Sequence, residues 1–305
     1  MLRHDYIRPE GNGYTPLECE NGASGGRSRH AARDAESTLT FPISANRNSL
    51  NAVIHNLLGF VSLNIEEIED IKATLHAELQ LYKDYNIIIE GQKIEHVWIV
   101  VEGLACRYKI LENGRRQILG FMIPGDFCNV QFVQQNIYDH NVALLSESRL
   151  IKVPIQRLLS LIKNNPKISR ALSLSVLVEH ATLREWLLNI GQRNAIERIS
   201  HLFCEMRDRY DAIGQMDASG SFPLLLNQTA IADTTGLTPV HVNRTLQRMR
   251  DMGMIELCQR RLTILDPSRL AATAGFDGKY LRVNRSAAPG LGEFACLRPF
   301  ASYAA

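Results

Sequence analysis

The sequence has no closely spaced cysteines. Six cysteines are scattered along 305 residues and none forms a Cys-x-x-Cys pair, which excludes a compact disulfide framework and a finger-type zinc site. Such scattered thiols are typical of a protein in a reducing compartment. The cysteines are Cys19, Cys106, Cys128, Cys204, Cys258 and Cys296.

Long apolar segments are also missing. No run approaches the roughly 20 residues of a membrane-spanning helix, and the first residues, MLRHDYIRPEGNGYT, lack the apolar core of a signal peptide. The formal net charge is only +2, so any contact with nucleic acid must come from a local basic patch. These absences predict a cytoplasmic protein with no membrane partner.

The N-terminal half of the chain changes from helical to strand periodicity. Apolar spacing predicts two leading helices, at Leu50–Leu58 and Ile65–Leu79. From Tyr82 to Ile155, short apolar runs alternate with turn signals, of which Asn113-Gly114 is the strongest for a hairpin. Several short strands joined by such turns predict a small antiparallel β-roll.

A long helix is predicted from Ile168 to Asn189. Its apolar residues lie on more than one face, so two sides must be covered. The roll can cover one side, and a second copy of the helix in a C2 dimer can cover the other. The alternative is a helix enclosed within a monomer, for which one small roll provides too little cover. The predicted dimer contacts are Leu172, Val176 and Leu183.

The segment from Leu226 to Met254 has the spacing of a helix-turn-helix. Asn227 is a good N-cap for a short first helix, and Gly236 allows the sharp turn that follows. Thr238 and Pro239 then mark the N-cap and first residue of a second helix. The inward face of this second helix consists of Val242, Leu246 and Met249.

The outward face of the second helix is rich in hydrogen-bond donors. The next residues, Met254–Leu257 and Leu262–Leu265, predict a two-stranded wing around a turn that contains Arg260 and Arg261. Five arginines and two acidic residues in 238–261 give a net charge of +3, which suits contact with phosphates. The alternative is an ordinary helical hairpin with a solvated charged face. The outward residues are His241, Asn243, Arg244, Gln247 and Arg248.

These segments predict an α+β fold of two domains, because 305 residues with 45% hydrophobic content can bury a core of that size. Residues 1–45 are rich in Gly, Ser and charge without periodicity, which predicts a disordered arm. The other predicted parts are a β-roll sensor domain with leading helices (46–163), a dimerisation helix (164–190), a winged helix-turn-helix domain (191–282) and a flexible tail (283–305).

Three motifs in this order support a resemblance to a known family. They are Gly-Asp-Phe at 125–127, Asn165-Pro166, and the stretch Gly236–Arg250. With them, the chain resembles the family of the cyclic-AMP receptor protein and the fumarate and nitrate reduction regulator over Leu50–Tyr280. It looks closest to a branch whose members have no assigned effector. The resemblance implies a transcription regulator, not an enzyme, that binds a palindromic DNA operator as a homodimer, with RNA polymerase as a further expected partner.

The resemblance also assigns the DNA contacts. The family's base-reading positions fall on Pro239, Val240 and Arg244, and the Arg244 fork suits the O6 and N7 atoms of guanine. The cyclic-AMP receptor protein has Arg and Glu at the first two positions, so a different half-site is expected here. Asn243 lies beside Arg244 and can reach an adenine edge. The other expected contacts, mostly to the DNA backbone, are Gln228, Thr238, His241, Arg248, Arg260 and Arg261.

The sequence does not identify the signal that the roll senses. Cyclic-nucleotide binders of the family carry a Gly-Glu and an Arg-Ser pair after the Gly-Asp-Phe turn, whereas Cys128–Leu145 contains no Arg, Lys, Ser or Gly. We therefore expect no binding of cyclic AMP and no cofactor. An iron-sulfur cluster would need grouped cysteines in the N-terminal arm, where only Cys19 lies. The remaining hypotheses are a thiol switch at Cys106 and Cys128, or a small ligand near Phe121, Phe132 and Tyr138.

Two functions of another class are the alternatives. A cupin-like metalloenzyme also uses a β-roll, but its metal needs converging His and carboxylate ligands. The roll contains only His96 and His140, which are far apart in sequence and lack an H-x-H or H-x-x-x-E grouping. We therefore predict no metal site and no catalytic residue. A module that binds no nucleic acid is the second alternative, and it requires Arg244→Ala to leave DNA affinity unchanged.

Overall fold

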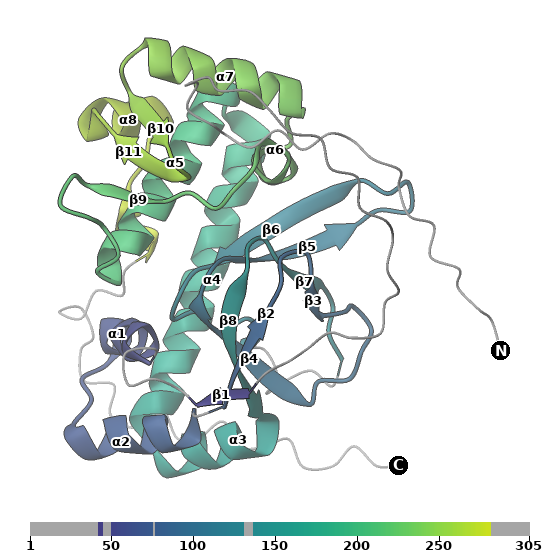
Figure 1. Ribbon diagram of the computed structural model, residues 1–305, viewed down its shortest axis with the longest axis vertical. Coiled ribbons are helices and arrows are strands. Elements are labelled where there is room, and N and C mark those ends of the chain that lie inside the picture. Colours follow the sequence, from purple (N-terminus) through teal and green to yellow (C-terminus); the bar gives the residue numbers. More distant parts are fainter. Residues whose placement is uncertain (1–41, 45–49, 76, 131–136, 282–305) are drawn as a thin grey trace, which may run out of the picture.

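The computed structural model describes residues 42–44, 50–75, 77–130 and 137–281. A β-roll lies beside a long helix, and a smaller domain of helices and short strands lies toward one end of that helix (Figure 1). The fold is therefore α+β, as predicted, with a β-rich N-terminal domain followed by a helix-turn-helix domain.

The roll consists of two four-stranded antiparallel sheets. Its strands are β1 (Pro42–Ser44), β2 (Ala77–Leu81), β3 (Asn86–Ile88), β4 (His96–Glu102), β5 (Ala105–Ile110), β6 (Arg116–Met122), β7 (Asn141–Leu144) and β8 (Ser148–Pro154). The strand orders are β1-β2-β8-β4 and β3-β7-β5-β6. Gly114 turns the β5-β6 hairpin with φ of 79°, and its amide donates to the Leu111 carbonyl at 2.8 Å. The Asn-Gly hairpin is therefore where the sequence predicted it.

The ends of the chain differ in part from the prediction. Strand β1 lies within the segment that was expected to be a disordered arm, and it pairs with β2 through Ile43 opposite Glu78. That part of the prediction was wrong. The rest of the arm, apart from these residues, and the whole predicted tail lie outside the described residues.

Three short helices flank the roll: α1 (Asn51–Phe60), α2 (Ile65–Thr74) and α3 (Ile155–Asn164). A capping box starts α2, because the Asn64 side chain accepts from the Glu67 amide at 2.8 Å and the Glu67 carboxylate accepts from the Asn64 amide at 2.7 Å. The helix predicted to reach Leu79 ends at Thr74 instead. Leu79 lies in β2 opposite Leu150 of β8, so sheet pairing outweighs the local helical spacing.

The longest helix, α4 (Pro166–Gln192), runs along the roll toward the C-terminal domain (Figure 1). It starts at Pro166, two residues before the predicted start at Ile168, and the Asn165 side chain accepts from the Ile168 amide at 3.3 Å. Of the residues predicted to meet a partner, Leu172 is buried in the protomer, and Val176 and Leu183 are half-buried. Leu172 is only 6% exposed and, with Val176, packs on the roll core, while Leu183 lines a cavity.

Three other apolar residues of α4 are exposed. Leu177 is 60% exposed, Leu187 is 74% exposed and Leu188 is 45% exposed. Around the helix, Leu177 and Leu188 lie about 100° or more from Val176, whereas Leu187 lies within about 40° of Val176 and Leu183.

The C-terminal domain follows α4. Its elements are α5 (Ala195–Ala212), β9 (Ser221–Pro223), α6 (Gln228–Thr235), α7 (Pro239–Asp251), β10 (Ile255–Cys258), β11 (Arg261–Ile264), α8 (Pro267–Ala274) and the 3-10 turn η2 (Gly278–Leu281). Helix α5 contacts α6, α7 and α8, and the short sheet has the order β10-β11-β9. Phe203, Phe222 and Leu246 are buried in the core that joins these layers.

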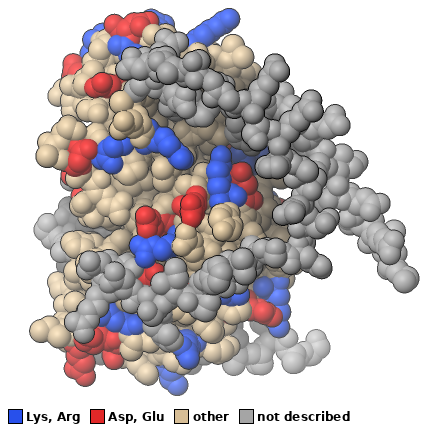
Figure 2. All heavy atoms as spheres, in the orientation of Figure 1, with Lys and Arg blue, Asp and Glu red and all other residues tan. Residues whose placement is uncertain are grey.

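The molecular surface carries charges of both signs. On the face seen in Figure 2, basic and acidic side chains are interspersed over both domains. On this face, the charges therefore do not separate into one acidic and one basic half. Among the described helices, none combines the length and the apolar composition needed to cross a bilayer.

Candidate DNA-binding interface

The first helix of the motif, α6, is defined at both ends by local signals. The Asn227 side chain accepts from the Ala230 amide at 2.7 Å and caps the helix. Gly236 ends it in the left-handed region, with φ of 66°, and the next amide, Leu237, donates to the Ala232 carbonyl at 3.2 Å. The turn predicted at Gly236 is therefore the corner between α6 and α7.

The second helix, α7, begins at the predicted residues. Thr238 is its N-cap, with the hydroxyl accepting from the His241 amide at 3.2 Å, and Pro239 follows in the first turn. Thr245 is buried, and its hydroxyl donates to the His241 carbonyl at 2.8 Å. The three predicted inward residues, Val242, Leu246 and Met249, are each at most 1% exposed.

The opposite face of α7 is open to solvent and lies at an extremity of the molecule (Figure 1). Arg244 and Arg248 make no ion pair with any residue that the structure describes. Gln228, at the start of α6, is half-buried. At the N-cap of α7 and along the helix, the predicted contact residues that are exposed are Thr238, Pro239, Val240, His241, Asn243, Arg244 and Arg248.

Polar side chains in the C-terminal part of the outer face of α7 bind one another. The Gln247 amide donates to the Asp251 carboxylate at 2.8 Å, and the Arg250 guanidinium donates to the Gln247 side-chain oxygen at 2.6 Å. These side chains therefore satisfy one another, whereas those of the N-terminal half face solvent. The first two turns of α7, together with Arg248, have donors available for another molecule.

The wing is a hairpin of β10 and β11, but its two arginines are not equivalent. Gln259 and Arg260 form the turn with φ values of 47° and 60°, and the Arg260 side chain is exposed. The prediction that Arg261 also lies in the turn was wrong, because Arg261 is the first residue of β11. Its guanidinium donates to Ser221 Oγ and to the Ser221 carbonyl, both at 2.7 Å, and pairs with Asp217 at 2.9 Å.

Asp217 is the acidic member of this network. Hydrogen bonds from Ser219 and Ser221 hold the pKa of Asp217 well below its usual range. Asp217 is therefore a carboxylate that binds the Arg261 guanidinium at neutral pH. Of the predicted basic residues in the wing, Arg260 is exposed and makes no ion pair with a described residue, whereas Arg261 is partly exposed and paired with Asp217.

Comparison with known proteins assigns both domains to known domain families. Residues 197–273 match the Crp-like helix-turn-helix domain, and residues 78–165 match the cyclic nucleotide-binding domain. The nitrogen fixation regulation protein FixK of Bradyrhizobium diazoefficiens is 31% identical over 176 residues, which cover 57% of this chain and 72% of that protein. The chain belongs to the Crp/Fnr family.

Other relatives agree with this assignment. The transcriptional activator protein FnrL of Cereibacter sphaeroides is 29% identical over 67% of this chain and 84% of its own. The solved structure of FixK2 from Bradyrhizobium japonicum matches with a TM-score of 0.58 and 25% identity, over 64% of this chain and 96% of that one. This Crp/Fnr protein is therefore a DNA-binding transcription regulator, and these relatives are regulators, not enzymes.

Sequence reasoning missed a buried ion pair inside the roll of this Crp/Fnr protein. Arg107 in β5 is 6% exposed, pairs with Glu179 of α4 and donates to the Cys128 carbonyl at 3.1 Å. The signal in the sequence was a single arginine within the apolar run of β5. The Glu179 carboxylate therefore balances the buried charge of Arg107.

The two thiols suggested as a switch lie in the core of the roll. Burial raises the pKa of the Cys106 thiol to about 12, and burial also raises the pKa of the Cys128 thiol. Both side chains are 0% exposed. Because the reactive species is the thiolate, this setting favours apolar packing over a redox role.

The residues suggested to line a ligand site are separated in the structure. Phe121 lines a cavity of about 510 Å³ between α1, β6, α4 and α5. Tyr138 instead packs in the roll core, where its hydroxyl donates to the His96 carbonyl at 3.0 Å. Phe132 lies outside the described residues. Of the two described residues, Phe121 lines this cavity and Tyr138 does not.

The histidines considered for a metal site are likewise apart. His140 is buried and its Nδ1 lies 2.6 Å from the Asp139 carboxylate, while His96 lies at the start of β4. In 42–44, 50–75, 77–130 and 137–281, no three His, Cys, Asp or Glu side chains come together in a group that could hold a metal.

Proposed function

We propose that this regulator binds a palindromic operator as a homodimer, with α7 of each subunit in the major groove. The observation that supports this most directly is the exposed, unpaired Arg244 on a helix that starts at Thr238 and Pro239. Its fork can donate two hydrogen bonds to the O6 and N7 atoms of guanine. Two such helices would enter successive major grooves about 34 Å apart.

The other exposed residues divide into two groups by their chemistry. Pro239, Val240 and Asn243 lie beside Arg244, where apolar surface and an amide can contact base edges. Thr238, His241, Gln228 and Arg248 offer donors that suit phosphate oxygens. We place Arg260 with the second group, because the wing turn presents it to solvent, and we leave Arg261 out because Ser221 and Asp217 bind its guanidinium.

We propose the free face of α4 as the dimer interface. Five exposed positions follow one another along α4 at alternating intervals of four and three residues. This is the spacing of a coiled-coil seam, and its apolar members Leu177 and Leu187 are more than half exposed in the protomer. The seam consists of Ser173, Leu177, His180, Arg184 and Leu187.

The partners follow from the proposed function. Relatives of this chain carry the name transcriptional activator, which supports RNA polymerase as the protein partner of the DNA-bound dimer. A DNA target places the regulator in the bacterial cytoplasm. We assign it no effector.

The experiment that tests this function is selection of bound DNA from a random pool by the full chain. A palindromic consensus with guanine in each half-site, and a footprint that spans two major grooves, are the expected results. Recovery of unrelated sequences, or of single half-sites only, contradicts sequence-specific binding by a dimer.

We expect Arg260→Ala to weaken binding to all DNA sequences alike. Loss of one phosphate contact from each of two wings lowers the slope of log affinity against log salt by about 2, at roughly 0.9 per contact. Arg261→Ala is the matched control, because its guanidinium is bound to Ser221 and Asp217, and it should leave the slope unchanged. Equal slopes for Arg260→Ala and the wild type would remove Arg260 from the interface.

We expect isothermal titration of the full chain with cyclic AMP to give no binding heat. The reason is that Glu179 already neutralises the buried Arg107, and the described part of Cys128–Leu145 adds no cation. Glu179→Gln is the comparison variant, since it leaves Arg107 without its carboxylate. Saturable binding of cyclic AMP by the wild type would contradict this expectation.

A further inference from the structure

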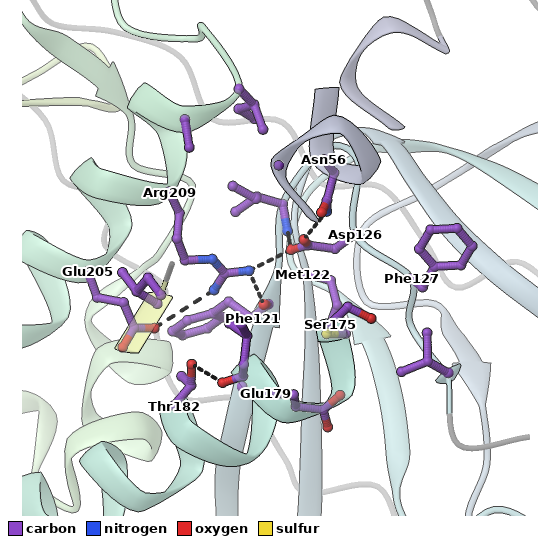
Figure 3. A pocket seen from close by; sticks show the side chains of 18 of the residues that line it. Asn56, Phe121, Met122, Asp126, Phe127, Ser175, Glu179, Thr182, Glu205 and Arg209 are labelled. Atoms are coloured by element: carbon purple, nitrogen blue, oxygen red, sulfur yellow. Dashed lines mark hydrogen bonds and ion pairs between the residues drawn. The ribbon is translucent and has the colours of Figure 1, made fainter. Parts of the chain in front are cut away.

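An ion pair connects the roll to the DNA-binding domain. Arg209 of α5 donates to the Asp126 carboxylate at 2.5 Å and to the Phe121 carbonyl at 2.9 Å. Figure 3 shows the guanidinium between Asp126 on one side and Glu205 on the other, at the edge of the cavity between the two domains. Asp126 belongs to the Gly-Asp-Phe motif of the roll, and Arg209 belongs to the helix beneath α6 and α7.

The roll holds Asp126 firmly in place. Its carboxylate also accepts from the Ile123 amide at 2.8 Å and from the Asn56 side chain of α1 at 3.0 Å. The preceding Gly125 has φ of 96°, and a Cβ there would lie 2.5 Å from the Ala52 carbonyl oxygen. Only glycine permits this close approach of the turn to α1. Asp126 is therefore a fixed acceptor on the roll side.

The DNA-binding domain holds Arg209 from the other side. Glu205, one turn earlier on α5, lies 3.8 Å from the guanidinium. The Glu205 carboxylate in turn accepts from Trp186 of α4 at 2.9 Å and from the Tyr280 hydroxyl at 2.8 Å. A continuous chain of polar contacts thus runs from the roll, through Arg209, to the end of α4 and the C-terminal turn.

A second contact lies at the opposite end of the same strand. Arg116, the first residue of β6, pairs with Asp233 of α6 at 2.8 Å, and the Gln117 amide donates to the Thr234 carbonyl at 3.3 Å. The Arg209 contact is to Phe121, near the last residue of β6. A strand of this length spans about 20 Å, so the two contacts restrict rotation of the domain on the roll.

We propose that Arg209 is a positioning residue that fixes the orientation of each recognition helix and thereby the spacing of half-sites that the regulator accepts. This proposal rests on the proposed function, because spacing has a meaning only for a dimer on a palindrome. One extra base pair displaces and rotates one half-site relative to the other, since about 10.5 base pairs make a turn. A domain held by Asp126 and Phe121 cannot follow that rotation, whereas a released domain can.

The test compares operators whose half-sites are separated by the preferred spacer or by one base pair more or less. The wild type should discriminate between them by at least about tenfold, and Arg209→Met should reduce this to about threefold or less. Affinity for an isolated half-site should stay within about twofold, because α7 is untouched. A general loss of stability would lower half-site and palindrome binding together.

The control is Arg207→Met on the same helix. Its side chain is 39% exposed and lies near α8, away from the roll, so the variant should keep the wild-type spacer preference. Asp126→Asn removes the charge from the roll side and should reproduce the Arg209→Met result, which keeps the test decisive if the methionine variant does not fold. In the double variant the two effects should not add.

Two results would overturn the proposal, and they differ. Wild-type spacer preference in folded Arg209→Met or Asp126→Asn shows that the ion pair does not set the geometry, and leaves the proposed function intact. Failure of the wild-type chain to bind any selected palindrome removes the proposed function, and the spacing proposal falls with it.

Discussion

Arg244→Ala should weaken binding to the selected palindrome by about 2 to 6 kcal/mol, because each half-site loses a bidentate contact that contributes roughly 1 to 3 kcal/mol. The variant should also bind operators changed at one symmetric base pair as well as it binds the original. Both effects follow from an exposed guanidinium that no described residue pairs. Titration of a labelled operator and its single-base variants, at fixed salt, measures them together.

Arg250→Ala is the matched control for this prediction. It removes the same charge from the same helix, but the Arg250 side chain is bound to Gln247 on the outer face near the end of α7. We expect it to keep the base preference of the wild type. If Arg244→Ala and Arg250→Ala lose affinity equally and neither changes base preference, Arg244 contacts no base and the alternative of a solvated charged face is correct.

Leu187→Asp should dissociate the dimer. Leu187 is 74% exposed in the protomer, and in the proposed seam it would be covered by the partner helix, where two facing carboxylates would repel each other. Loss of bivalent binding should reduce affinity for the palindrome by at least about a hundredfold. Sedimentation equilibrium gives the subunit mass in solution, and the operator titration gives the affinity.

Ile65→Asp provides the comparison for this variant. Ile65 is 81% exposed on α2, so the substitution adds the same charge at an exposed apolar position outside the seam. It should leave both the mass in solution and the operator affinity unchanged. A Leu187→Asp protein that remains dimeric would show that the subunits associate through another surface.

The helix-turn-helix was predictable because its signals are local. Asn227, Gly236, Thr238 and Pro239 each act within three or four residues of their position, through a cap, a left-handed turn or a fixed φ. The Asn-Gly hairpin of the roll is local in the same sense. Such features depend on neighbours along the chain, so the sequence determines them without knowledge of the fold.

Boundaries that depend on distant partners were not predictable in this way. The periodicity of Ile65–Leu79 is helical throughout, but β8 pairs with Glu78–Leu81, so the end of this segment is a strand. On α4 the apolar residues surround the helix, so only the position of the roll decides that Leu172 is covered and Leu187 is free. Both features depend on packing between segments that are far apart in the sequence.

The sequence by itself determined the local elements of this regulator: the caps, the corner and the inward face of the recognition helix, and the Asn-Gly hairpin turn of the roll. Tertiary structure alone decided which charged side chains are free and which are engaged. Arg260 and Arg261 are neighbours in the chain, yet only the latter reaches Ser221. Arg107 meets Glu179, and Arg209 meets Asp126, across 72 and 83 residues. A charge is paired or exposed according to what the fold brings within a few ångströms of it, and no pattern along the chain carries that information.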